Sequence, residues 1–255
     1  MPVIVGILSP RCRLRADFGP RRHRTVRPAA IVLNTLDQVP PELDIVLPCL
    51  DEAQALPWVL ERIPAGARAV VVDNGSRDGS PDVARAGGAT VVTCDRRGYG
   101  AACHAGLEAA EAEFVAFCDC DASLDPADAL RLVDLLRAGA DLAVGRRVPA
   151  ARGVWPLHAR LANVELARRV RRRTGVGLRD VGPLRAARRE PLLGLPIADR
   201  RSGYPVETVV RASEAGWRIE QVDVGYSPRA GRSKVTGTLH GTVQAVRDMS
   251  RVLRE

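Results

Sequence analysis

The chain of 255 residues contains a single lysine, Lys234, among its 38 basic residues. Together with the abundant alanine, this ratio indicates a coding bias that replaces lysine wherever arginine will serve. A lysine that survives such a bias is a candidate for a position that needs a compact ammonium group instead of a planar guanidinium. Lys234 is therefore a side chain of interest before any motif is considered.

Long apolar runs are also lacking. The longest, such as Ala69–Val72, have the length of a strand, so no segment is expected to span a bilayer. The first ten residues, MPVIVGILSP, have no basic leader and no convincing cleavage site, which argues against a signal peptide. We expect a cytoplasmic protein, with contact at the inner face of the membrane left open.

The six cysteines form no CxxC pair, and the four histidines are scattered along the chain. Most of the cysteines lie inside apolar runs, where a reduced thiol packs as a small hydrophobic group. A zinc site is therefore not expected, and a reducing compartment is the simpler interpretation.

Aromatic residues are scarce, and the charges are unevenly distributed. The three Phe, three Tyr and three Trp do not alternate with arginines as platforms for stacked bases would. Residues 31–145 hold 8 basic and 19 acidic side chains, whereas residues 146–189 hold 13 arginines and 2 acids. The basic segment therefore suits a phosphate-bearing or anionic lipid partner better than nucleic acid, although solvated surface charge would also explain it.

Short apolar runs alternate with helical patterns from Asp44 onward. The expected strands are Asp44–Leu47, Arg68–Val72, Thr90–Cys94, Phe114–Cys118 and Asp141–Val144. The expected helices between them are Ala53–Arg62, Pro81–Ala86, Ala101–Ala110 and Ala127–Arg137. This alternation predicts an α/β fold in which a mostly parallel central sheet carries helices on both faces. We expect residues 1–40, rich in Arg and Pro, to be a poorly ordered extension and residues 41–255 to form one domain.

The pattern is less regular after residue 145. The expected elements there are helices at Leu157–Arg173, Tyr204–Ala215 and His240–Leu253, a strand at Arg218–Tyr226, and a loop with the sequence SPRAGRSKVTGT. The helix Leu157–Arg173 is strongly basic and has an apolar stripe. It could pack on the core or lie on a membrane surface with its arginines toward lipid headgroups, and the sequence leaves both open.

Two polar clusters follow the first two expected strands. PCLDE, residues 48–52, places Asp51 and Glu52 before a helix, where acidic side chains could simply cap it. DNGSRDGS, residues 73–80, places Asp73 where an acid can accept hydrogen bonds from a ribose or a base, although its Asn-Gly and Asp-Gly pairs also favour a plain turn. Ligands of such sheets bind beyond the carboxyl ends of the strands, so both clusters are candidate nucleotide contacts.

A glycine-rich segment, RGYGAACHAG at residues 97–106, follows the third expected strand and opens a helix. Its small residues would let the backbone approach a ligand, and Arg96 or Arg97 could meet a phosphate. Because it follows the third strand and its third glycine is displaced, it does not fit the dinucleotide-binding loop of a dehydrogenase.

The segment FCDCDASLDP carries the strongest chemical signal. If Phe114–Asp121 stays extended, the two-residue period places Asp119 and Asp121 on the same side. Two such carboxylates repel each other unless a cation or a proton lies between them. A hard divalent ion, Mg²⁺ or Mn²⁺, with a diphosphate completing its oxygen shell fits this arrangement and would neutralise charge on a leaving diphosphate. A polar turn closing at Asp125–Pro126 is the plainer alternative.

In their order and spacing, these segments resemble family-2 glycosyltransferases with the GT-A fold. The resemblance rests on PCLDE, DNGSRDGS, RGYGAACHAG, the DCD triplet with LDP after it, and VGRR at residues 144–147. It continues through residues 180–195, 203–219 and 228–238, toward the subgroup of polyprenyl-phosphate sugar transferases that includes dolichyl-phosphate mannose synthase. The resemblance implies a nucleotide-diphospho-sugar transferase fold, with a nucleotide-sugar half at residues 41–147 and an acceptor half at residues 148–255.

The resemblance also implies a role for each matching residue. The residues expected to border the nucleoside of a UDP- or GDP-linked sugar are Pro48, Asp51, Glu52 and Asp73. Those expected near the diphosphate and its metal ion are Gly98, Gly100, Asp119 and Asp121. Those expected to hold phosphate on the acceptor side are Arg229, Arg232, Ser233 and Lys234. The sequence departs from the family's usual pattern at Asn74 and Cys120 and in lacking transmembrane helices.

The chemistry implied is an inverting single displacement, in which an acceptor oxygen attacks the anomeric carbon as the nucleotide diphosphate leaves. A phosphate acceptor is already ionised, whereas a hydroxyl needs a nearby carboxylate as base, for which Asp199 and Glu207 are the candidates beside Asp121. The basic second half favours a polyprenyl phosphate, which would require peripheral contact with a membrane. Transfer to a sugar or small-molecule hydroxyl and a non-catalytic nucleotide-sugar-binding protein remain as alternatives.

Overall fold

The computed structural model describes residues 41–151, 153–231 and 239–254. The extension predicted at residues 1–40 lies outside the described residues, and so do Arg232, Ser233 and Lys234 of the predicted acceptor loop. The described residues belong to one compact unit, Val39–Glu255.

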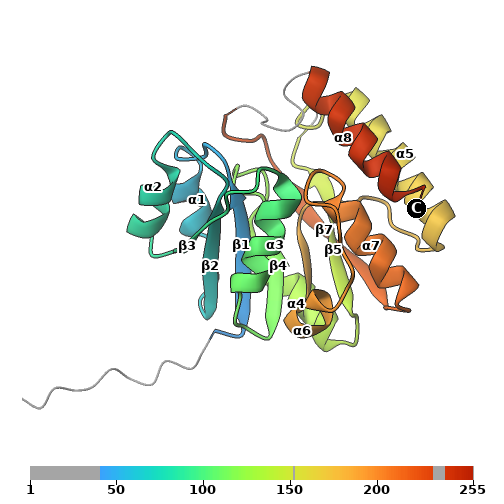
Figure 1. Ribbon diagram of the computed structural model, residues 1–255, viewed down its shortest axis with the longest axis horizontal. Coiled ribbons are helices and arrows are strands. Elements are labelled where there is room, and N and C mark those ends of the chain that lie inside the picture. The colour runs from blue at the N-terminus through green and yellow to red at the C-terminus, as the bar shows by residue number, and fades with distance from the viewer. Residues whose placement is uncertain (1–40, 152, 232–238, 255) are drawn as a thin grey trace, which may run out of the picture. The chain divides into compact units, whose positions relative to one another are not determined.

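A seven-stranded sheet runs through this unit in the order β3-β2-β1-β4-β6-β5-β7 (Figure 1). Its strands are β1 (Leu43–Cys49), β2 (Ala67–Asp73), β3 (Thr90–Thr93), β4 (Phe114–Phe117), β5 (Leu142–Pro149), β6 (Arg185–Arg188) and β7 (Ile219–Tyr226). β6 pairs antiparallel with β4 and β5, and the other pairs are parallel. The prediction of a mostly parallel central sheet is confirmed.

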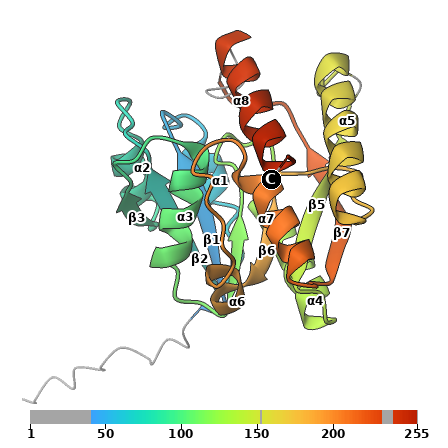
Figure 2. The same cartoon turned by 45° about the vertical axis from the view of Figure 1, so that its right-hand side comes forward.

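Helices cover both faces of this sheet (Figure 2). They are α1 (Leu56–Leu60), α2 (Ser80–Ala86), α3 (Tyr99–Ala109), α4 (Ala129–Arg137), α5 (Leu157–Thr174), α6 (Arg189–Leu193), α7 (Tyr204–Glu214) and α8 (Leu239–Val252). Val46 of β1 packs in one core with α3 and α7, whereas Ile45 and Leu47 pack with α1 and α4 in a second core. This alternation is what a strand buried on both faces requires. Within the described ranges, no helix has the length and apolar character needed to cross a bilayer.

The sequence pattern does not predict β6, whose sequence is RAAR. The side chain of Arg185 is fully buried there, and its Cζ lies 5.3 Å from the ring centre of Phe117 on the neighbouring strand. A short segment with an arginine at each end lacks the continuous apolar run by which a buried strand is recognised. Its aromatic neighbour offers the guanidinium a cation–π contact inside the core.

A buried ion pair lies at the amino-terminal edge of the sheet, on the side away from the polar loops. The carboxylate of Asp44 is fully buried and accepts hydrogen bonds from Arg68 Nε and Nη2, both at 2.8 Å. It also accepts bonds from the backbone nitrogens of Glu111 and Ala112, at 2.7 and 3.0 Å. Burial opposes ionisation, but these bonds outweigh it and hold the pKa of Asp44 below its ordinary 3.8.

Candidate functional site

The carboxyl ends of β1, β2 and β4 meet at one edge of the sheet, where a cavity of about 300 Å³ opens. β1 lies between β2 and β4, so the strand order reverses direction here, and open α/β sheets bind their ligands at such a point. Four of the predicted donor and metal residues line the cavity, namely Pro48, Glu52, Asp119 and Asp121. The structure therefore brings together clusters that the sequence placed on separate strands.

Asp51 and Asp73 are not among the described residues that line the cavity. Asp51 adopts a left-handed φ of 55°, and its Oδ1 accepts a hydrogen bond from the backbone nitrogen of Arg77 at 2.7 Å. The Oδ1 of Asp73 accepts a bond from the backbone nitrogen of Ser76 at 3.0 Å, and Ser76 Oγ accepts one from the backbone nitrogen of Asp51 at 2.9 Å. These bonds join the PCLDE loop to the DNGSRDGS loop, and the contact of both acids with a nucleoside stays a prediction.

The first helix is shorter than predicted. α1 covers Leu56–Leu60 instead of Ala53–Arg62. The backbone nitrogens of Glu52 and Ala53 donate to Ser80 Oγ at 2.8 Å and to Asp78 Oδ2 at 2.9 Å. These bonds tie Glu52 and Ala53 to the DNGSRDGS loop, and Glu52 lines the cavity.

Asn74 joins three loops at the cavity wall. Its backbone nitrogen donates to Cys49 O at 2.9 Å, and its Nδ2 donates to Cys94 O at 2.9 Å and to Arg96 O at 2.8 Å. Its Oδ1 accepts a bond from the backbone nitrogen of Gly98 at 2.8 Å. An aspartate, which this position more often holds in the resembling family, has no amide hydrogens to donate. Asparagine at position 74, where the sequence departs from the family's usual pattern, therefore makes bonds between loops that aspartate could not make.

Gly98 and Gly100 pack against the backbone of residues 200–201. Gly98 has a φ of 140°, and a Cβ added there would lie 2.2 Å from Arg200 O. A Cβ on Gly100 would lie 2.7 Å from the Cβ of Tyr204, and Ala101 N donates to Arg200 O at 2.8 Å. Close approach of two backbones therefore requires both glycines. Neither is among the described cavity residues, so their place beside a diphosphate stays a prediction.

The predicted metal pair and the beginning of the predicted acceptor loop lie together. Arg229 Nη2 is 3.1 Å from Asp121 Oδ2, and the backbone nitrogen of Ala230 donates to Asp121 O at 2.8 Å. A further backbone bond of 2.9 Å runs from Ser227 N to Ser123 O. Arg229 also lines the cavity. Donor and acceptor residues predicted from segments more than a hundred positions apart thus share one site.

The electrostatics of the aspartate pair fit a divalent cation. Burial and the charge of Asp121 raise the pKa of Asp119 from 3.8 to about 6, although Arg229 opposes the shift. A carboxylate with a raised pKa lies where negative charge is incompletely neutralised, and a cation would relieve it. No three His, Cys, Asp or Glu side chains of the described residues gather to hold a metal. A bound ion would therefore complete its shell with diphosphate and water oxygens, as Mg²⁺ and Mn²⁺ sites commonly do.

Arg147 lines the cavity and was predicted only as part of the VGRR motif, without a role. Its Nε and Nη2 donate to Oδ2 and Oδ1 of Asp180 at 2.9 and 2.8 Å, and its Cζ lies 4.4 Å from the ring centre of Trp155. A bidentate carboxylate and a stacked ring hold a guanidinium in one orientation. The signal available in the sequence was an arginine pair inside the otherwise apolar strand LAVGRRVP.

Tyr99 also lines the cavity and was missed because it lies inside the glycine-rich segment. Burial, reinforced by the charge of Asp119, raises the pKa of the Tyr99 phenol well above its ordinary 10. The side chain therefore remains a neutral hydroxyl near Asp119, with its oxygen buried.

Asp199 and Glu207, the two candidates for a general base, do not line the cavity as far as the chain is described. Glu207 is 2% exposed, and its Oε2 accepts bonds from the backbone nitrogens of Ala198 and Asp199 at 3.0 and 2.6 Å. Asp199 Oδ1 accepts bonds from the backbone nitrogens of Arg201 and Gly203 at 2.7 and 3.1 Å. Both carboxylates hold a turn, so their catalytic role stays a prediction that this geometry does not favour.

Comparison with known proteins places the chain among glycosyltransferases. The family model described as glycosyl transferase family 2 matches residues 44–194. An uncharacterized glycosyltransferase of Mycobacterium tuberculosis (strain H37Rv) is 50% identical over 82% of this chain and 96% of its own length. A dolichyl-phosphate hexose transferase of Haloferax volcanii is 31% identical over 76% of this chain and 86% of its own length.

A solved structure extends the comparison to the fold. Glucosyl-3-phosphoglycerate synthase from Mycobacterium tuberculosis, in complex with Mn²⁺, UDP and glucosyl-3-phosphoglycerate, matches with a TM-score of 0.65 and 25% identity. The match covers 84% of this chain and 80% of that chain. With its strand order, its cavity at the β1–β4 reversal and these relatives, the chain belongs to glycosyl transferase family 2 and is a glycosyltransferase with the GT-A fold.

Proposed function

We propose that this glycosyltransferase moves a sugar from a UDP- or GDP-linked donor to a polyprenyl phosphate, with inversion at the anomeric carbon. The observation that carries the proposal is the composition of the cavity wall. Two arginines, Arg147 and Arg229, line it together with the aspartate pair, whereas both candidate bases are engaged elsewhere. An acceptor that brings its own negative oxygen suits such a site.

The donor part of the proposal depends on the loops after β1, β2 and β4. Pro48 and Glu52 form the wall where a nucleoside would bind, and Asp119 and Asp121 lie where its diphosphate would reach. Structures of the phosphoglycerate synthase neighbour contain UDP with Mn²⁺ or with Mg²⁺. A divalent ion bound by this aspartate pair would neutralise negative charge on the departing diphosphate.

The acceptor part depends on the arginines. The guanidinium of Arg147 lines the cavity and is fixed by Asp180 and Trp155, and its remaining N–H groups would hold a phosphate in one orientation. In the transfer step, a phosphate oxygen forms a bond to the anomeric carbon while the bond from that carbon to the donor diphosphate breaks. No proton has to be removed, which agrees with the absence of a carboxylate other than Glu52 and the aspartate pair among the described cavity residues.

A second candidate acceptor is a small phosphorylated molecule with a free hydroxyl. The solved neighbour was crystallised with phosphoglyceric acid and with glucosyl-3-phosphoglycerate, and the same arginines would hold the phosphate of such a molecule. This reaction needs a base for the hydroxyl proton. Glu52, Asp119 or Asp121 would have to serve, since those are the carboxylates that line the described cavity.

The two candidates are separated by one set of incubations. The full chain is mixed with UDP-glucose or GDP-mannose, Mn²⁺, and one of three acceptors: a short polyprenyl phosphate, the matching polyprenol, or 3-phosphoglycerate. We expect radiolabelled sugar in the organic phase with the polyprenyl phosphate and none with the polyprenol. Product with 3-phosphoglycerate alone would overturn the lipid acceptor while leaving the cavity assignment in place.

A further inference from the structure

The exposed face of α5 carries apolar side chains in its first half and arginines in its second half. Leu157, Leu161 and Val164 are 70%, 61% and 60% exposed. Because a helix turns by about 100° per residue, the same stripe continues into the last two turns. Three exposed arginines lie there: Arg168, Arg171 and Arg172. The opposite side of α5 is packed on the protein, where Val170 is fully buried.

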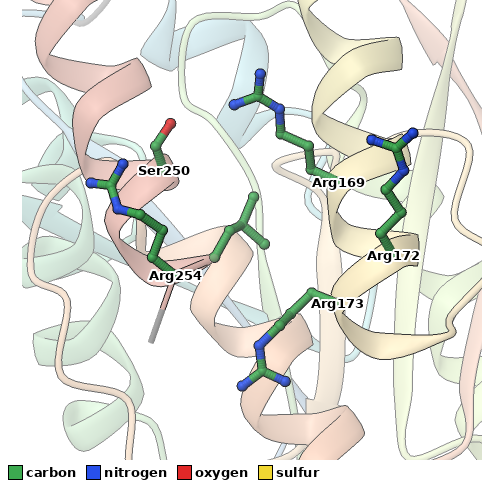
Figure 3. Close-up of a pocket in the computed structure, with 6 residues that line it drawn as sticks. Arg169, Arg172, Arg173, Ser250 and Arg254 are labelled. Atoms are coloured by element: carbon green, nitrogen blue, oxygen red, sulfur yellow. The ribbon is translucent and has the colours of Figure 1, made fainter.

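A groove of about 470 Å³ lies between α5 and α8, and both helices pack on α7 (Figure 3). Arg169, Arg172 and Arg173 line it from α5. Ser250, Leu253 and Arg254 line it from α8 and the residues that follow. Figure 3 shows the labelled arginines of the two helices on either side of a common opening.

The arginines of the groove are only partly neutralised. Arg169 pairs with Glu165 at 2.7 Å and Arg173 with Glu214 at 2.5 Å, so these two have carboxylate partners. The guanidinium groups of Arg172 and Arg254 make no hydrogen bond or ion pair with another described residue, although the charge of Arg172 helps to lower the pKa of Glu165. Four guanidinium groups around one opening repel one another, and an anion with several oxygens would lower that energy and accept their hydrogen bonds.

We propose that this groove binds the phosphate of an anionic phospholipid headgroup, with Leu157, Leu161 and Val164 inserted among the headgroups of the same bilayer. An exposed apolar stripe beside arginines is typical of a helix that lies in a membrane interface. Anionic lipids attract such clusters, whereas a nucleic acid would give the apolar stripe no partner.

The membrane would meet the protein next to the candidate active site. Met249 of α8 lines the cavity that holds the aspartate pair, and Leu253, one turn later, lines the arginine groove. Lipid binding by the groove is separate from the proposed sugar transfer, because it does not depend on which acceptor is used. Its test therefore measures binding to vesicles instead of catalysis.

The first test compares two double variants that each remove two positive charges. The Arg172→Gln/Arg254→Gln variant alters the groove. The Arg85→Gln/Arg218→Gln variant alters two exposed arginines of α2 and of the turn before β7. Binding is measured by flotation with vesicles of phosphatidylcholine alone and of phosphatidylcholine mixed with phosphatidylglycerol. We expect the wild type to bind only the anionic vesicles, and the groove variant to bind them about twenty-fivefold more weakly, since each arginine contributes roughly fivefold. The affinity of the control variant for the anionic vesicles should fall by less than half of the fold-change seen for the groove variant.

The second test separates a lipid surface from a soluble anion. Leu161→Ser/Val164→Ser leaves every arginine in place, and we expect it to weaken vesicle binding at high salt, where charge attraction is screened. Equal loss in the control and groove variants would overturn the groove as the site. Absence of vesicle binding, together with a thermal shift by inorganic phosphate that the groove variant loses, would overturn the lipid surface. Binding of an RNA oligonucleotide that the groove variant loses, without vesicle binding, would also overturn it.

Discussion

Asp44 lies at the amino-terminal end of β1, whereas Asp119 follows the carboxyl-terminal end of the neighbouring strand β4. The surroundings of the two side chains shift their pKa values in opposite directions. Asp44 accepts bonds from Arg68 and two backbone amides, which outweigh its burial and lower its pKa below 3.8. Asp119 experiences burial and the charge of Asp121, which raise its pKa to about 6. A carboxylate whose bonds are complete contributes to the stability of the fold. A carboxylate with incomplete bonds is available to a ligand, at some cost in stability.

The largest effect expected from this comparison is on catalysis. Asp119→Asn removes the charge available to a metal ion, and we expect sugar transfer to fall on the order of a thousandfold. The readout is the initial rate with the donor and acceptor found active, at saturating Mn²⁺. Asp134→Asn, at an exposed carboxylate of α4, is the matched control and should keep the wild-type rate. A rate within tenfold of wild type for Asp119→Asn would contradict the metal assignment.

The second effect is on stability, at the amino-terminal end of β1. Asp44→Ala leaves the Arg68 guanidinium and two backbone amides without their acceptor, and we expect the free energy of unfolding to fall by about 3 kcal/mol. Urea unfolding followed by circular dichroism measures it. Glu111→Ala removes only the exposed partner of Arg68 and should cost less than about 1 kcal/mol. Equal losses in the two variants would show that the buried bonds of Asp44 do not dominate.

The third effect concerns the acceptor side of the cavity. Arg147→Gln removes the charge-assisted contact that we propose with an acceptor phosphate, and we expect the acceptor KM to rise about ten- to a hundredfold while the donor KM stays near wild type. Steady-state kinetics with each substrate varied in turn measure both. The control is Arg146→Gln, at the adjacent position, where the guanidinium pairs with Asp223. A donor KM that rises as much as the acceptor KM would place Arg147 on the donor side.

The smallest effect is a pH dependence of stability in the metal-free protein. Because folding raises the pKa of Asp119 above its ordinary 3.8, the folded state binds the proton more tightly than the unfolded state. The stabilising contribution of this proton is complete below the ordinary pKa and is lost as the pH rises through about 6. We therefore expect metal-free Asp119→Asn to melt at a higher temperature than wild type above about pH 7, with the difference shrinking toward about pH 5. A difference that grows as the pH falls would contradict the raised pKa.

Much of the structure of residues 41–147 was predictable because its signals are local. The strands β1, β2 and β4 are apolar runs, and the spacing in DCD together with the rule for strand ends placed Asp119 and Asp121 beside PCLDE. The role of Arg147 was not predictable in this way, because it depends on Asp180 and Trp155, which reach it only in the folded chain. β6 was missed for a related reason, since its buried Arg185 has the sequence pattern of a surface residue.

Residues 148–255 were harder to predict, because their signal is a high arginine content with no motif residues at a fixed spacing. The sequence showed that α5 is basic but left its environment open. The structure shows that one side of the helix packs on the protein and the other carries exposed leucines and arginines. Asp199 and Glu207 illustrate the opposite problem. A carboxylate that caps a turn and a carboxylate that serves as a base look alike in the sequence. They are distinguished only in the folded chain, by whether nearby backbone amides donate to them.

Asn74 limits how this protein can change over evolutionary time. Its side chain donates two hydrogen bonds and accepts one, all to backbone atoms of loops that surround the cavity. Aspartate and serine can replace only part of this set, and glutamine is longer by a methylene group. A single substitution would therefore disturb three loops at once, whereas the side chain of Arg96 takes no part in these bonds, because Asn74 binds only its backbone carbonyl. We expect a deep mutational scan selected for activity to tolerate few residues at position 74 and many at position 96.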